Sequence, residues 1–130
     1  MGMTRKALLM LFAVASATLL IAGCRSHEIT VVIRNKTSGT INDVEVDYPA
    51  GPPSNGSQSF GTDHLNAASQ FQYTFKPTGD GNLKLRFVDS FGHSREEPGP
   101  EVHAGDHGEI FVNVAGDGKD EWRANLFPAQ

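Results

Sequence analysis

The residues best suited to chemistry gather in the segment 103–107, which reads His-Ala-Gly-Asp-His. His103 and His107 stand four residues apart with the carboxylate of Asp106 between them, and these are ligand types that bind zinc or copper. A metal centre usually needs three or four converging ligands. The residues that would complete such a site from other loops are His64, His93 and Glu96. The alternative is a polar turn with both histidines in solvent, so no cofactor is assigned.

A second group of possible ligands lies in one later turn and contains Asp117, Asp120 and Glu121. Carboxylate oxygens are what calcium prefers, but a calcium loop places its oxygen ligands at alternating positions that this turn lacks. The spacing therefore predicts an ordinary acidic turn between two strands.

A third pattern is the run Asp43, Glu45 and Asp47, whose alternation puts three carboxylates on one face of a strand at intervals of about 6.6–6.8 Å. Such a ladder fits a cationic partner. It fits equally well opposite Lys84 and Arg86, which alternate in the same way and would form cross-strand pairs. A charged, solvated strand face also discourages edge-to-edge aggregation.

Motifs of common enzyme classes are missing from the sequence. There is no G-x-S-x-G nucleophile elbow, no glycine-rich phosphate loop and no H-E-x-x-H zinc motif. The sequence therefore predicts a protein that is not an enzyme and that carries no cofactor.

The elements that must position these residues are short strands, because apolar residues alternate with polar ones in several runs. Three residues in each run are expected to face the core. The runs are Ile29, Val31, Ile33; Val44, Val46, Tyr48; Phe71, Tyr73, Phe75; Leu83, Leu85, Phe87; Ile110, Val112, Val114; and Trp122, Ala124, Leu126. No stretch after residue 27 has helical periodicity, so the pattern favours an all-β fold.

Turn residues divide these strands, and they predict the connections. The composition of 49–59 and 90–100, rich in proline, glycine and polar residues, indicates long loops. Pro77 to Gly81 has the chemistry of a hairpin turn, which predicts hairpins over 70–89 and 108–126. About seven strands of this kind are typical of a single antiparallel β-sandwich of immunoglobulin-like or transthyretin-like type.

The aromatic residues divide into two groups. Five fall on predicted inner faces and are expected in the core: Phe71, Tyr73, Phe75, Phe87 and Trp122. If Phe60, Phe91 and Phe127 were exposed together, they would form a binding patch instead.

The chain begins with a basic segment, continues with an apolar run from Ala7 and reaches Ile21-Ala22-Gly23-Cys24, which contains its single cysteine. This order is typical of a secretory signal, and its last four residues resemble the lipobox of bacterial lipoproteins. The resemblance implies cleavage before Cys24, a diacylglyceryl group on its sulfur and acylation of its new amino group. The apolar run is shorter than the roughly 20 residues of a spanning helix.

The lipobox divides the chain into a signal peptide over 1–23, a lipidated cysteine with a short tether over 24–27 and a sandwich domain over 28–127. Three tether residues reach about 10–14 Å, which places the domain close to its membrane. In Gram-negative lipoproteins an aspartate after the cysteine favours inner-membrane retention. Arg25 stands there, which resembles the outer-membrane case.

Charge excludes one class of partner. The signal segment holds two basic residues and no acidic ones, so its removal lowers the formal charge from −4 to −6. An acidic domain without a basic stripe does not bind nucleic acid. The sequence predicts a non-enzymatic envelope lipoprotein that binds an envelope protein partner, with a metal- or small-ligand-binding periplasmic lipoprotein as the alternative.

Overall fold

The computed structural model describes residues 27–52 and 56–129, and this part of the chain is all-β. Its eight strands, one more than the seven expected, are β1 (Ile29–Asn35), β2 (Ile41–Ala50), β3 (Gly56–Leu65), β4 (Gln70–Phe75), β5 (Gly81–Val88), β6 (Ser94–Val102), β7 (His107–Val114) and β8 (Glu121–Phe127). Within the described ranges no helix is long and apolar enough to cross a membrane. The signal segment, Cys24 and Arg25 lie outside these ranges, so their roles stay predictions.

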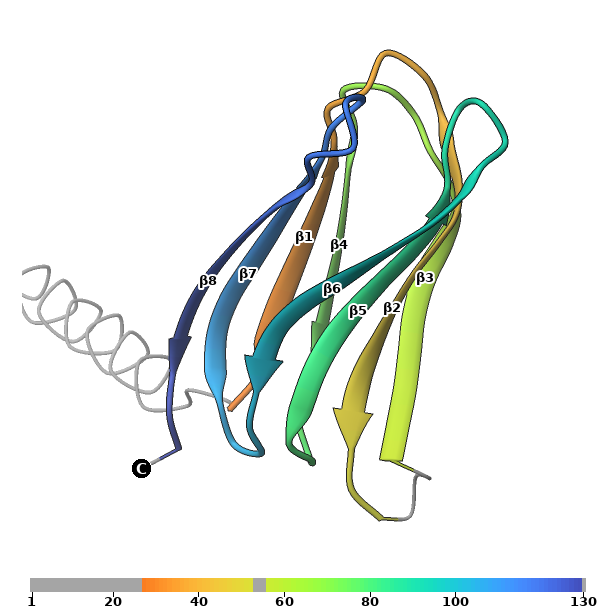
Figure 1. Cartoon of the computed structure of the whole chain (residues 1–130). Coiled ribbons are helices and arrows are strands. Elements are labelled where there is room, and N and C mark those ends of the chain that lie inside the picture. Colours follow the sequence, from red (N-terminus) through yellow and green to blue (C-terminus); the bar gives the residue numbers. More distant parts are fainter. Residues whose placement is uncertain (1–26, 53–55, 130) are drawn as a thin grey trace, which may run out of the picture.

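The strands form two four-stranded sheets that face each other (Figure 1), which confirms the β-sandwich. Sheet A has the order β4-β1-β7-β8 and sheet B the order β3-β2-β5-β6. All pairs are antiparallel except β1 with β7, which is parallel. Immunoglobulin constant domains group their strands as ABED and CFG. The observed grouping, with four strands in each sheet, differs from theirs.

The core lies between the sheets and includes most of the residues that alternation placed inward. Ile29, Val31 and Ile33 of β1 are 0% exposed. The inward triplets of β2, β5 and β7 are buried as well, together with Phe60 and Phe75. Phe71, Trp122 and Leu126 are partly buried against this cluster, whereas Ala124 of the predicted inner face is exposed. Ile41, Leu65 and Val102 are core residues that no predicted run included, so period-two patterning identified most of this core and not all of it.

The predicted hairpin over 70–89 is wrong. β4 pairs with β1 in sheet A, whereas β5 pairs with β2 and β6 in sheet B. The segment 76–80 therefore crosses from one sheet to the other. Proline and glycine favour a change of direction in both kinds of connection, so composition does not distinguish them. The second predicted hairpin, over 108–126, is confirmed by the antiparallel pairing of β7 and β8.

The predicted loop over 90–100 is also wrong, because most of it belongs to β6. β6 is an edge strand, where Pro98 is tolerated because one side of the strand needs no ladder hydrogen bonds. Its residues opposite buried Phe87 and Leu85 are Arg95 and Glu97. The inward side of β6 thus carries charges, which removes the alternation that marks other strands and also protects an edge from aggregation.

The two ends of the sandwich differ in what they contain (Figure 1). We call near end the one where β1 begins and β8 finishes, with the segments 76–80 and 103–106. We call far end the opposite one, which holds the turns 36–40, 66–69, 89–93 and 115–120. The far end is consequently the end of the domain opposite the first residue of β1.

Candidate functional site

The far end presents one bare aromatic ring, that of Phe91 in the loop between β5 and β6. Its exposed fraction is 81%, whereas Phe60, Phe75 and Phe87 are each 7% exposed or less. Burying a large aromatic side chain contributes about 1.5–3 kcal/mol, which is forgone when the ring stays in water. An exposed ring of this size is the type of side chain that anchors protein interfaces.

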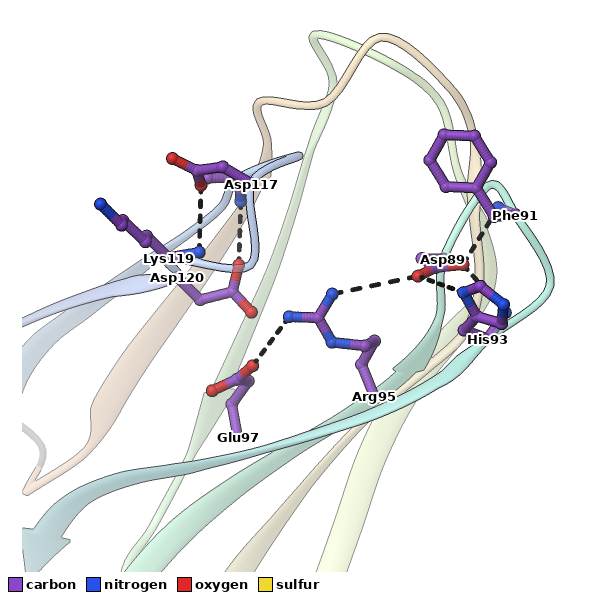
Figure 2. Close-up of polar contacts among 9 residues, drawn as sticks. Asp89, Phe91, His93, Arg95, Glu97, Asp117, Lys119 and Asp120 are labelled. Carbon is purple, nitrogen blue, oxygen red and sulfur yellow. Dashed lines mark hydrogen bonds and ion pairs between the residues drawn. The ribbon is translucent and has the colours of Figure 1, made fainter.

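The loop that carries Phe91 is held by Asp89 (Figure 2). One carboxylate oxygen of Asp89 accepts hydrogen bonds from the backbone N–H groups of Phe91, at 3.0 Å, and His93, at 2.9 Å. The backbone N–H of Asp89 donates to the carbonyl of His93, and that of Gly92 donates to the carbonyl of Asp89. Gly92 has a φ of 82°, a conformation that glycine adopts readily. These bonds fix the loop, so Phe91 is displayed by ordered backbone.

The hydrogen bonds of this loop also act on the acidity of Asp89. The backbone N–H of His93 is the largest cause that lowers the pKa of Asp89, and the N–H of Phe91 and the charges of His93 and Arg95 add to it. A lowered pKa keeps Asp89 ionised and therefore keeps it an acceptor over a wider pH range.

Arg95 of β6 extends this arrangement from the Asp89 loop toward the 115–120 turn (Figure 2). Its guanidinium lies 3.9 Å from a carboxylate oxygen of Asp89 and 3.4 Å from one of Glu97. The guanidinium carbon is 6.0 Å from the centroid of the Phe87 ring. A Cβ added at Gly118 would come within 3.0 Å of Arg95, so the 115–120 turn packs directly on this side chain. Arg95 thereby connects β6 with two far-end turns.

Asp120 completes the group from the 115–120 turn. One of its oxygens accepts a hydrogen bond from the N–H of Ala115 at 2.9 Å, and the other is buried without a partner among the described residues. Burial is the main cause that raises the pKa of Asp120, and the neighbouring carboxylate of Glu97 raises it further, against the opposing charge of Arg95. The carboxylates of Asp120 and Glu97 thus repel each other, and protonation of Asp120 relieves the repulsion.

The buried amide of Asn35 fixes the opposite side of the far end. Asn35 is 1% exposed, and its Nδ2 donates to the carbonyls of Gly39 and Leu65 at 2.9 and 2.8 Å. Its Oδ1 accepts from the N–H and the hydroxyl of Thr37 at 3.0 and 2.6 Å. Because Leu65 belongs to β3, these bonds connect the end of β1 in sheet A to sheet B.

The histidines of the candidate metal site have different surroundings. His103 lies 3.7 Å from carboxylate oxygens of both Asp80 and Glu101. The ring of His107 instead contacts His27 and Phe127, with centroids 5.6 and 5.5 Å apart. Within 27–52 and 56–129, no group of three or more His, Cys, Asp or Glu side chains is arranged to hold a metal ion. Asp106 caps its own turn by accepting from the N–H of His103 at 2.8 Å.

The other residues singled out from the sequence have structural contacts. Asp117 accepts from the N–H of Lys119 at 3.0 Å, so the acids of this turn do not converge. Phe60 is buried, and Phe91 and Phe127 lie at opposite ends, so the three phenylalanines form no common patch. The aromatic core set is right except that Tyr73, stacked on Phe60 with centroids 4.3 Å apart, remains 40% exposed.

Sequence reasoning did not identify Asp89, Arg95 or Asn35 as residues of interest. A signal for two of them was present. Asp89 and Asn35 each precede a short polar turn, and both residue types hydrogen-bond to backbone two residues further on. Arg95 had no such signal, because its partners come from distant parts of the chain.

Comparison with known proteins adds information on the fold alone. No family model matches this sequence, and no curated protein matches it. A solved structure that resembles it is an NMR structure of a protein from Eubacterium rectale. It aligns with a TM-score of 0.51 over 75% of this chain and 88% of that chain, at 8% sequence identity.

Proposed function

We propose that this protein is a non-enzymatic lipoprotein of the bacterial cell envelope, held at a membrane by lipid on Cys24, that binds an envelope protein through its far end. The observation that carries the proposal is Phe91, which is 81% exposed on a loop fixed by Asp89. The loop lies at the end of the sandwich opposite the first residue of β1. A membrane anchor near β1 would point this loop away from the membrane, toward a partner in the periplasm.

The binding mode follows from the chemistry of the loop. A single rigid ring inserts into an apolar pocket of the partner, and the order of the loop reduces the entropy lost on binding. The surrounding polar residues would form the rim of such an interface. Arg25 after the cysteine favours the outer membrane as the site of attachment where the organism has one.

Site-specific photo-crosslinking in intact cells tests the partner. A photoreactive phenylalanine analogue at position 91 should give one reproducible protein adduct. The same analogue at Phe127, which is 52% exposed at the near end, is the matched control and should not give that adduct. Absence of an adduct at position 91, or the same adduct at both positions, would count against far-end binding.

Anchoring is tested separately. Cys24→Ala should release the chain from the membrane fraction, and mass spectrometry of the native chain should find an acylated N-terminal cysteine. An unmodified cysteine in membrane-free protein would overturn the anchor without affecting the test of Phe91.

A further inference from the structure

The outer face of sheet A has a hollow of about 210 Å³ that is lined by five side chains of three strands. These residues are Arg34 of β1, Phe111 and Asn113 of β7, and Glu121 and Arg123 of β8. In the strand register Arg34 lies beside Asn113, which faces Glu121, and Arg123 faces Phe111. The two arginines thus stand on opposite sides of β7, the strand that carries Phe111.

The arginines of this hollow are available to an anion. The guanidinium carbon of Arg34 lies 5.2 Å from the centroid of Phe111, a cation–π contact that orients the group without neutralising its charge. Among the residues that the structure describes, neither Arg34 nor Arg123 forms an ion pair with a carboxylate. Glu121 lines the same hollow and lies outside ion-pair distance of both.

Asn113 lines the hollow between the two arginines, because it pairs with Arg34 on one side of β7 and with Glu121 on the other. The hollow thus offers two cations and one neutral amide beside the carboxylate of Glu121.

A second hollow, of about 310 Å³, adjoins the first because Arg34 lines both. Lys36, Ser69 and Gln70 are among its lining residues. A ligand that crosses Arg34 from one hollow to the other would meet a third cation and further polar groups. This arrangement suits an extended chain better than a small ion.

We propose that these two hollows form a binding site for an acidic peptide. Its carboxylates would be bound by Arg34 and Arg123, because guanidinium groups match carboxylates in geometry. An extended acidic peptide can place carboxylates in both hollows at once, which a single small anion cannot do. The site extends from the outer face of sheet A to the far-end turns 36–40 and 66–69, and none of its lining residues belongs to the Phe91 loop.

The test uses the full chain in detergent and a fluorescent hexaglutamate peptide, with binding followed by anisotropy. Arg34→Gln and Arg123→Gln should each weaken binding about tenfold, as expected for loss of a charge-assisted contact. Arg86→Gln is the matched control, because Arg86 is already paired with Glu45 and Asp47. It should change affinity less than about twofold. Glu121→Gln should tighten binding, because it removes the one carboxylate of the first hollow.

Three results would overturn the proposal. The first is no saturable binding of hexaglutamate, and the second is an equal loss with Arg86→Gln. The third is full competition by inorganic phosphate at the peptide's own concentration, which would indicate an unselective anion site. A hexaglutamine peptide should not bind, since it keeps the backbone donors and lacks the charge.

Discussion

The outer faces of the two sheets carry similar charges and use them differently. On sheet B, Arg86 lies 3.1 Å from Glu45 and 3.0 Å from Asp47, and Lys84 pairs with Glu96. On sheet A, the guanidinium of Arg34 lies over an aromatic ring and makes no ion pair within the described residues. The first face neutralises its cations internally, while the second leaves them for a ligand.

Arg34 and Arg86 both point outward from a strand, so their position in the strand does not explain the difference. What differs is whether a carboxylate lies close enough to neutralise the charge. Arg34 and Arg86 both alternate with apolar neighbours in sequence. The hydrogen bond to Asp47 is the main cause that raises the pKa of Arg86, which reflects how well its charge is compensated. Glu45 and Asp47 of the ladder thus pair with Arg86, as the cross-strand alternative predicted. Lys84 pairs with Glu96 of β6 instead, and Asp43 has no ion pair among the described residues.

The two sheet faces can be compared only in a folded domain, and Asn35 is the residue whose replacement should lower the stability of the fold most. Asn35→Ala removes four side-chain hydrogen bonds and leaves the buried carbonyl of Leu65 without its donor. We expect the free energy of unfolding to fall by about 2–4 kcal/mol, measured by urea denaturation. Asn42→Ala is the control, because the side chain of Asn42 bonds to His64 in an exposed position. An equal loss in both variants would contradict the role given to Asn35.

Replacing Phe111 on the outer face of sheet A should lower the free energy of unfolding more than replacing the exposed Phe91. It lies beside Val32 in register, and Val32 is 6% exposed although it faces outward. Phe111→Ala uncovers this apolar contact, so we expect a loss of about 1–2 kcal/mol in unfolding free energy. Phe91→Ala removes the same ring from an exposed loop and should cost less than about 0.5 kcal/mol. Similar losses would mean that Phe111 is no more integrated than a loop residue.

Asp120, in the 115–120 turn of the far end, should make the stability of the domain depend on pH. Its pKa is raised above 3.8 in the folded state, so the folded chain binds more protons than the unfolded chain above that pH. Its contribution to stability therefore falls as pH rises from about 3.8 through the folded pKa, and it stays low at neutral pH. Asp120→Asn should remove this fall and raise the unfolding free energy at pH 7 by about 0.5–1 kcal/mol, a partly screened effect.

The control for that measurement is Asp117→Asn, which changes a carboxylate of the same turn that faces Lys119. Its pH profile should follow that of the native chain. A profile of Asp120→Asn that also follows the native chain, with no gain at pH 7, would refute the repulsion between Asp120 and Glu97.

The smallest expected effect concerns salt. Arg86→Gln should lower stability by about 0.3–0.5 kcal/mol in dilute buffer, and the difference should vanish near 1 M salt because exposed ion pairs are screened. Arg34→Gln should lower stability by an amount that changes little with salt, because Arg34 contacts the ring of Phe111 and not a carboxylate. Thermal melts of both variants across a salt series compare the two slopes, and equal slopes would remove the distinction between the faces.

Much of the fold was readable from the sequence because the core depends on local alternation. The inward triplets of β1, β2, β5 and β7 are all buried. Pairing partners were not readable in the same way. The turn at 77–81 has equal chemistry whether it joins two strands of one sheet or two sheets, and β6 turns charges inward where a core strand turns apolar residues.

The candidate sites were harder to predict from the sequence than the core, because they depend on which strands pair. Arg34 and Arg123 are far apart in sequence and meet only because β7 lies between their strands. The acids and histidines that attracted attention are neighbours in sequence, and neighbours along a turn do not in general converge on one point. Lipidation of Cys24 rests on a local motif, and it stays a prediction because Cys24 lies outside the described residues.

The parallel pairing of β1 with β7 has a consequence for the timing of folding. Ile29 is paired with Gly108, so the centre of sheet A joins residues separated by most of the domain. Contacts of such high sequence separation make folding slow. Sheet A stays incomplete until synthesis has passed β7, and β1 waits without that neighbour until then. Under the lipoprotein function proposed above, the chain would cross a membrane before it folds, and this late closure would help to keep it unfolded until then.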